Sequence, residues 1–279
     1  MSLTFPAPPE IPLWRLALRR APGLRGDATI PRIEAHAERI SGDAEAYGPV
    51  CGFPTADPLP PTWPAVATTG LQLAVMAAPA FPLPVLGIVH VRQQLTWTRP
   101  LAASEPLSAR CTVEGHRVVR RGGEFDLVTA VSAGGETVWS GVTTILSRAV
   151  RGDGIKLPRP EEPAWTPART ATWTLPAGLG RQYAAVSGDW NPIHLHPLTA
   201  WLFGLPRPIM HGWWLLARAL AELGADVPPA GRLDVRFLAP VSLPGTVTFA
   251  AAPDGAGVRF RISALTPCVV GRVDPLVPR

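Results

Sequence analysis

Two side chains that can exchange protons lie close together in one turn-rich segment of the chain. The segment Ser187–His194 reads SGDWNPIH and holds the carboxylate of Asp189 and the imidazole of His194. Its glycine permits sharp backbone geometry and its Asn-Pro step favours a turn, so the loop can fold both groups toward one point. A carboxylate and an imidazole that share one water form an acid–base pair. The carboxylate could hold or activate the water, and the imidazole could move the second proton.

A second feature follows shortly afterwards, where Pro208–Gly212 (PIMHG) leads into an apolar stretch. If a buried helix starts here, its first backbone N–H groups have no partner inside the helix and form a partly positive end. An oxygen placed there would be stabilised as it gains negative charge, as in an oxyanion hole. Gly212 has no side chain and would let that oxygen approach its N–H.

Other interpretations of these residues are open from the sequence. The loop alone is typical of a turn followed by a helix cap, and His211 alone is typical of a cap or a core histidine. Asp189, His194 and His196 could instead ligate a metal, because a His-x-His pair places two imidazoles on one face of an extended strand. The acid–base loop and the glycine-opened helix together favour the catalytic interpretation.

The composition narrows the class of protein. Apolar residues make up 47% of the chain and charged residues 17%, which is typical of a globular protein, and no apolar run reaches membrane-spanning length. The net charge of +5 comes from scattered arginines, without the basic stripe and exposed aromatics of a nucleic-acid-binding surface. Three widely spaced cysteines and an N-terminus unlike a secretion signal indicate a cytoplasmic protein. The lack of a membrane-spanning apolar run and of a basic stripe indicates that it binds neither membrane nor nucleic acid.

The elements that position the loop follow one order twice, an apolar helix and then strands. Residues 45–66 are dense in proline and are predicted as a loop before an apolar helix over Gly70–Ala78. A second apolar helix is predicted over Ile209–Leu223, with short helices over Leu179–Val186 and His196–Phe203 before it. The predicted strands are Gly87–Thr98, Leu107–Val119, Glu124–Ala133, Glu136–Ser147, Ala171–Leu175, Arg232–Leu238, Thr246–Ala251, Val258–Ala264 and Cys268–Val273.

The two halves also resemble each other in sequence. Thr68–Ala74 matches Met210–Leu216 at an offset of about 140 residues. A central helix followed by antiparallel strands, occurring twice, is an α+β arrangement in which a sheet wraps one helix. We therefore expect two domains, residues 1–150 and 171–279, joined by a linker over 151–170 that is rich in Pro, Arg and Glu.

Two adjacent motifs carry a resemblance to a known family. Tyr183–His194 (YAAVSGDWNPIH), followed by Gly204–Gly212 (GLPRPIMHG), resembles the MaoC-like family of (R)-specific enoyl-CoA hydratases and 3-hydroxyacyl thioester dehydratases. The match spans about thirty residues. It implies the hot-dog fold, and the weaker likeness of the first half implies a double hot-dog. In that fold two antiparallel sheets each wrap a central helix and pack as a pseudo-dimer.

The resemblance also implies an activity and a site. The activity is the reversible hydration of trans-2-enoyl thioesters of coenzyme A or acyl carrier protein, with no metal or redox cofactor. Asp189 and His194 are implied as the catalytic dyad, and the Gly212 N–H as the oxyanion donor. Supporting, substrate-side roles are implied for four further residues: Ser187, Asn191, His211 (at the mouth of the site) and Tyr183.

This sequence departs from the family pattern in two places. His196 stands where many members carry Asp, and the first half lacks the dyad motif and holds Thr69 where the second half has His211. We therefore expect one active site per chain, in the C-terminal half, in either a monomer or a homodimer. A hot-dog thioesterase and a non-catalytic acyl-thioester-binding protein are the alternatives.

Overall fold

In a computed structural model of the chain, the described residues are 1–12, 15–16, 19, 21–24, 29–85, 87–152 and 164–276. They form two compact units that are each discontinuous in sequence. The first comprises residues 1–41, 67–93 and 106–164, and the second comprises 42–66, 94–105 and 165–279. Residues 153–163, the middle of the predicted linker, lie outside the described residues.

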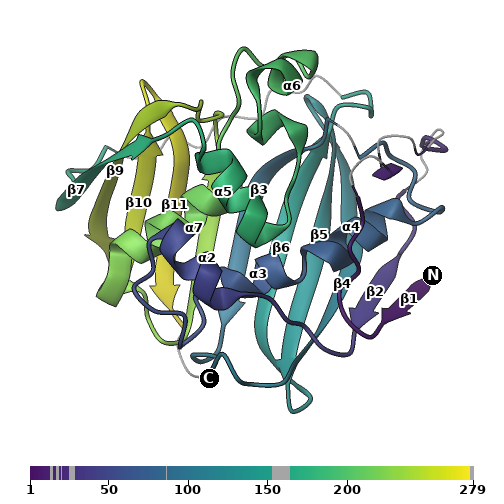
Figure 1. The fold of residues 1–279 in the computed structure, drawn as a ribbon, viewed down its shortest axis with the longest axis horizontal. Coiled ribbons are helices and arrows are strands. Elements are labelled where there is room, and N and C mark those ends of the chain that lie inside the picture. The colour runs from purple at the N-terminus through teal and green to yellow at the C-terminus, as the bar shows by residue number, and fades with distance from the viewer. Residues whose placement is uncertain are drawn as a thin grey trace. The chain divides into compact units, whose positions relative to one another are not determined.

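The first unit is a sheet with one apolar helix against it (Figure 1). Its strand order is β1-β2-β4-β5-β6, and the first residues of β3 follow beside β6. Strands β2, β4, β5 and β6 pair antiparallel, whereas β1 joins β2 in parallel. The elements are β1 (Ser2–Phe5), β2 (Glu34–Ala37), α4 (Thr69–Ala77), β3 (Val89–Trp97), β4 (Leu107–Val119), β5 (Gly122–Ala133) and β6 (Glu136–Ser147).

Helix α4 confirms the first predicted apolar helix. It buries Leu71, Ala74, Val75 and Met76 and packs against β2 and β4. Strand β5 shows the pattern from which the strands were predicted. Its residues alternate between more and less buried positions along most of its length. The hairpin between β5 and β6 turns at Gly134 and Gly135, whose φ angles of 57° and 89° suit a two-residue turn that follows the twist of the strands.

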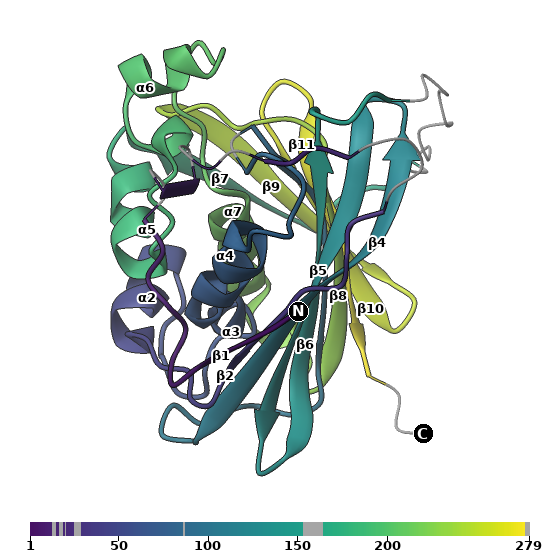
Figure 2. The ribbon, with the colours of Figure 1, turned by 90° about the vertical axis from the view of Figure 1, so that its right-hand side faces the viewer.

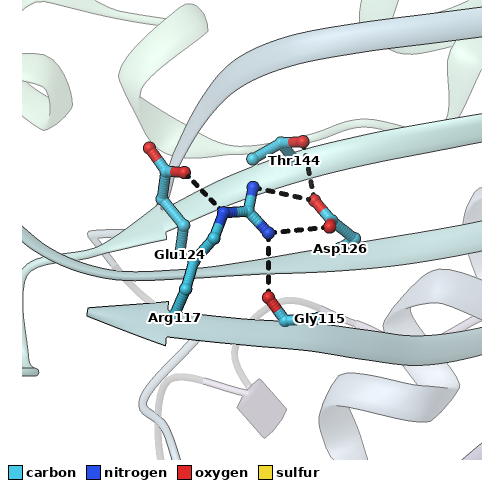
Figure 3. Close-up of polar contacts among 5 residues, drawn as sticks. All are labelled: Gly115, Arg117, Glu124, Asp126 and Thr144. Atoms are coloured by element: carbon cyan, nitrogen blue, oxygen red, sulfur yellow. Dashed lines mark hydrogen bonds and ion pairs between the residues drawn. The ribbon is translucent and has the colours of Figure 1, made fainter. Parts of the chain in front are cut away.

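An ion-pair cluster lies at an irregularity in the β4–β5 pairing, between Glu114 and Arg117 (Figure 3). The Arg117 guanidinium donates to both carboxylate oxygens of Asp126, at 2.8 and 3.2 Å, and to Glu124 at 3.1 Å. Thr144 on β6 donates to the same Asp126 carboxylate at 2.7 Å. Side chains of three neighbouring strands therefore meet at this cluster.

The second unit is also a sheet with helices. Its strand order is β8-β11-β10-β9-β7, every neighbour in that series pairs antiparallel, and the last residues of β3 lie beside β8. The helices stand to one side of these strands (Figure 2). The elements are α2 (Ala44–Cys51), α3 (Trp63–Ala67), β7 (Arg169–Leu175), α5 (Leu179–Ser187), η1 (Pro192–His194), α6 (Pro197–Leu202), α7 (Gly212–Leu223), η2 (Gly224–Asp226), β8 (Gly231–Phe237), β9 (Gly245–Asp254), β10 (Gly257–Ser263) and β11 (Pro267–Pro275).

Helix α7 is the second predicted apolar helix and starts three residues later than predicted. Ile209 and Met210 are extended, because their N–H groups donate to Ile193 and Val241 rather than within a helix. His211 is the N-cap residue and Gly212 is the first helical residue. The helix is buried along most of its length, through Trp214, Leu215, Leu216, Ala217, Ala219, Leu220 and Leu223.

The prediction of a loop over residues 45–66 is wrong at both ends, since α2 and α3 lie there. The Asp43 carboxylate accepts a hydrogen bond from the Ala46 N–H at 2.8 Å and so caps α2. Trp214 donates its indole N–H to the carbonyl of Val50 at 2.8 Å, which ties α2 to α7. The helix therefore forms despite Pro49, supported by its cap and by its tertiary contacts.

The predicted α+β class is confirmed, because each unit combines antiparallel strands with an apolar helix. Among the described residues, no helix has the length and apolar character needed to cross a membrane.

Candidate active site

The Ser187–His194 loop begins where α5 ends, and its own side chains fix its shape. Gly188 takes a left-handed conformation with φ of 71° as the C-cap of α5. The Ser187 hydroxyl accepts a hydrogen bond from the Asp189 N–H at 3.2 Å, and Asp189 Oδ1 accepts one from the Asn191 N–H at 3.1 Å. Asn191 Oδ1 in turn accepts from the Ile193 N–H at 3.4 Å. Ser187 and Asn191 are therefore placed to build the loop, and substrate binding by them stays a prediction.

His194 is buried, and its tautomer follows from one hydrogen bond. Its Nδ1 lies 2.7 Å from the carbonyl oxygen of Ile209, which can only accept, so Nδ1 carries the proton. Nε2 therefore carries a lone pair in the neutral ring. Burial lowers the pKa of His194 below its usual value, with Asp189 acting in the opposite direction. The ring is thus neutral at pH 7 and can accept a proton at Nε2.

His211 was expected at the mouth of the site, but its side chain is only 2% exposed. Its Nε2 donates to the backbone carbonyl of Asp189 at 3.0 Å, and its ring stacks on His194 with centroids 3.7 Å apart. Burial and the neighbouring His194 lower the pKa of His211 to about 4. His211 is therefore a buried, neutral residue that contacts both Asp189 and His194.

Asp189, His194 and His211 each offer a ligand atom, and these atoms lie within 4.8 Å of one another. The Asp189 side chain is 38% exposed, so solvent reaches the cluster at its carboxylate. Two groups at such a separation can share one water, because each hydrogen bond spans about 2.8 Å. The structure thus brings together the two residues of the predicted dyad.

The metal-binding alternative named Asp189, His194 and His196, and the structure does not group them. His196 is exposed, and its Nδ1 accepts a hydrogen bond from the Leu198 N–H at 3.2 Å as the N-cap of α6. A capping imidazole replaces the capping carboxylate that Asp would supply at this position. His196 therefore has a local structural role, and the third member of the cluster is His211.

Gly212 starts α7, and the first hydrogen bond that follows the cap runs from the Leu215 N–H to the His211 carbonyl. Among the described residues, none accepts a hydrogen bond from the Gly212 N–H. The structure shows a packing reason for glycine here, and the oxyanion role of its N–H stays a prediction. A Cβ at residue 212 would lie 3.0 Å from the Phe237 ring, so the missing side chain makes room for Phe237.

Tyr183 is buried beside His211. Its ring contacts His211 with centroids 4.9 Å apart, and its buried hydroxyl has no hydrogen-bond partner among the described residues. On its other side is Tyr47 of α2, at 6.3 Å, whose hydroxyl donates to Thr62 at 2.9 Å. Sequence reasoning missed Tyr47 because it treated this stretch as a loop, although Asp43 in capping position was a signal for a helix.

Sequence reasoning also missed Gly180, inside α5. A Cβ at this residue would lie 2.1 Å from the carbonyl oxygen of His194 and 3.3 Å from Leu243. The helix backbone and the Ser187–His194 loop therefore touch at a point where only glycine fits. A glycine inside a predicted helix was the available signal, since it often marks a close approach.

We expect Gly180→Ala to lower kcat/KM by about 10²-fold, because a displacement of a catalytic group by about 1 Å has that effect. The added methyl must push the His194 backbone away from α5, since the two cannot occupy the same space. Steady-state kinetics measures the change. Gly178→Ala is the matched control, because its Cβ would meet only Arg181, at an ordinary 3.7 Å. Wild-type kcat/KM in Gly180→Ala would show that the position of the loop does not matter.

The chain is similar in sequence to proteins of a known family. The family model described as MaoC like domain matches residues 160–267, which include the loop and α7. The chain is 37% identical over 213 residues to 3-hydroxyacyl-thioester dehydratase X of Mycobacterium tuberculosis, covering 75% of this chain and 76% of that protein. It is 36% identical over 70 residues to the (R)-specific enoyl-CoA hydratase of Aeromonas caviae, covering 24% of this chain and 52% of that protein.

A solved structure extends the similarity to the fold. The crystal structure of HtdX from M. tuberculosis matches with a TM-score of 0.77 and 32% identity, covering 87% of this chain and all of that one. The match confirms the predicted hot-dog fold.

Proposed function

We propose that this chain interconverts trans-2-enoyl and (R)-3-hydroxyacyl thioesters with Asp189 and His194. The chain belongs to the MaoC-like family of hydro-lyases, which hydrate or dehydrate acyl thioesters. The observation that carries this proposal is the cluster in which the Asp189 carboxylate and the neutral His194 ring offer ligand atoms within 4.8 Å of each other. One water can be held there by both groups.

In the hydration direction, the Asp189 carboxylate accepts a hydrogen bond from the water and directs its oxygen toward C3 of the substrate. His194 Nε2 accepts the other proton of the water as the C3–O bond forms. The electron pair of the C2=C3 bond moves onto the thioester oxygen as an enolate. The imidazolium then returns the proton to C2, and neutral His194 is restored. Hydroxyl and hydrogen add to the same face, and dehydration is the reverse.

The enolate oxygen needs a donor, and the Gly212 N–H at the start of α7 supplies one. It has no acceptor among the described residues, and it lies at the positive end of a twelve-residue helix. Removing one such donor typically costs about 3 kcal/mol of transition-state stabilisation.

His211 acts as a positioning residue in this proposal. Its hydrogen bond to the Asp189 carbonyl fixes the loop, and its ring stacks on the ring of His194 and holds it in place. With a pKa of about 4, it stays neutral at pH 7 and adds no positive charge that would compete with the proton on His194. The two histidines can therefore stack at close range without charge repulsion.

The proposed chemistry needs no metal or redox cofactor, because the water is activated by side chains and the electron pair stays within the substrate. The thioester carrier, coenzyme A or acyl carrier protein, arrives as part of the substrate.

Purified protein with crotonyl-CoA tests the proposal when enoyl absorbance and free thiol are followed together. We expect the absorbance to fall without release of thiol, and the rate to be unchanged after dialysis against EDTA. Thiol release would favour the thioesterase alternative, and tight binding without turnover would favour a binding protein. Loss of activity on chelation that added zinc restores would contradict the metal-free mechanism.

A further inference from the structure

An apolar helix face points away from the protein directly after the catalytic segment. Leu198, Trp201 and Leu202 of α6 are 61%, 66% and 67% exposed. Their spacing of i, i+3 and i+4 puts them on one face of the helix, which we call the α6 apolar face. Amphipathic helices normally turn such a face toward the core. In Figures 1 and 2, α6 lies apart from the strands of its unit.

This helix is held firmly to the segment that carries His194. The Thr199 hydroxyl donates to the carbonyl of Pro192, the first residue of η1, at 2.7 Å. Ala200, on the opposite side of α6, is fully buried. The exposure of the three large side chains is therefore a property of an anchored helix, and whatever covers them lies next to the catalytic loop.

The α6 apolar face lies in a stretch of the chain with a surplus of positive charge. From residue 163 to residue 221 the only acidic side chain is Asp189, whereas four arginines lie in the same stretch. Two of these arginines pair with carboxylates just beyond it. The other two, Arg181 and Arg207, are exposed, and no described carboxylate forms an ion pair with either. Arg181 donates to the carbonyl of Leu195 at 2.9 Å, one residue before the N-cap of α6. A partner for this surface is thus apolar at its centre and acidic around it.

We propose that the α6 apolar face is a docking surface for an acidic acyl carrier protein that presents the thioester substrate. The inference rests on the proposed function, since acyl groups on coenzyme A and on a carrier protein reach the dyad through the same phosphopantetheine thioester. The two carriers differ outside the site. A helical stripe at i, i+3 and i+4 fits a groove between the helices of a protein, whereas a nucleotide needs no such stripe.

Paired kinetics on crotonyl-CoA and on the crotonyl thioester of a bacterial acyl carrier protein tests the proposal. We expect Trp201→Ala and Leu202→Ser each to lower kcat/KM for the carrier-bound substrate about tenfold, which is typical of central interface residues. The value for crotonyl-CoA should stay within about twofold of wild type, since these side chains lie outside the dyad. Arg207→Glu should lower the carrier-bound value and weaken its dependence on salt.

Leu265→Ser and Arg236→Glu are the matched controls, because both residues are exposed elsewhere in the same unit, Leu265 in the turn between β10 and β11 and Arg236 on β8. Neither should change the ratio of the two kcat/KM values. Equal losses on both substrates, or no loss on either, would overturn the proposal. So would a wild-type preference for crotonyl-CoA that α6 variants leave unchanged, self-association that Trp201→Ala abolishes, or binding to anionic vesicles in place of the carrier. Turnover of crotonyl-CoA in these outcomes would leave the proposed function intact, so the two failures are distinguishable.

Discussion

Asp189→Asn is expected to lower kcat/KM for hydration of enoyl-CoA by about 10³-fold, the scale of a lost acid–base group. The substitution is close to isosteric and keeps Oδ1, which accepts the hydrogen bond from the Asn191 N–H at 3.1 Å. The turn should therefore persist. The second carboxylate oxygen, however, becomes an amide that donates hydrogen bonds. It can no longer hold a water whose oxygen must point at C3.

Stopped-assay or continuous kinetics on crotonyl-CoA measures this effect, and thermal unfolding checks the fold. Asp226→Asn is the matched control, because Asp226 lies in the same unit, is 51% exposed and forms an ion pair with Arg169 at the surface. Its loss should cost at most about 1 kcal/mol of stability and no activity. If Asp189→Asn retained wild-type kcat/KM, the role of the carboxylate would be refuted.

His194→Gln should lower kcat/KM by about 10²- to 10⁴-fold, because it removes the group that transfers the proton between the water and C2. Glutamine preserves much of the size and polarity of the buried ring. Its amide cannot, however, take up a proton near neutral pH. Kinetics on crotonyl-CoA again measures the change, and the loss should appear mainly in kcat.

The pH profile gives a second readout for His194. Because burial lowers its pKa, the ring stays neutral as the pH falls through 6.5, and the acid limb of kcat/KM should have its midpoint below that value. His196→Gln is the matched control, since this exposed residue caps α6 and lies outside the cluster of Asp189, His194 and His211. An acid limb centred above 6.5, or similar losses in the two variants, would contradict the assignment of His194.

Local patterns were enough to predict most of the fold. Strands β4 and β6 have the predicted bounds, Leu107–Val119 and Glu136–Ser147, and the apolar helices lie where periodicity placed them. These elements could be predicted because one face of each is more buried than the other, which gives their apolar residues a regular spacing. The prediction failed at α2, where prolines outweighed the capping signal of Asp43 and where the contact from Trp214 to Val50 spans 164 residues.

Part of the candidate site could likewise be predicted from local sequence, and part could not. Asp189 and His194 could be found because both lie in one short loop whose turn formers are adjacent in sequence. The burial of His211, its stacking on His194 and its hydrogen bond to Asp189 could not, because they depend on how α7 meets the loop from 22 residues away. The contact between Gly180 and the His194 carbonyl is likewise set by packing, not by any local pattern.

Hydration of crotonyl-CoA by the wild-type protein in D₂O tests the central claim most directly. We predict a 3-hydroxybutyryl-CoA of R configuration at C3 that carries one deuterium at C2, added to the same face as the hydroxyl. This outcome follows if one water, held between Asp189 and His194, supplies both groups. An S configuration, deuterium on the opposite face, or free coenzyme A in place of the hydrated product would contradict it.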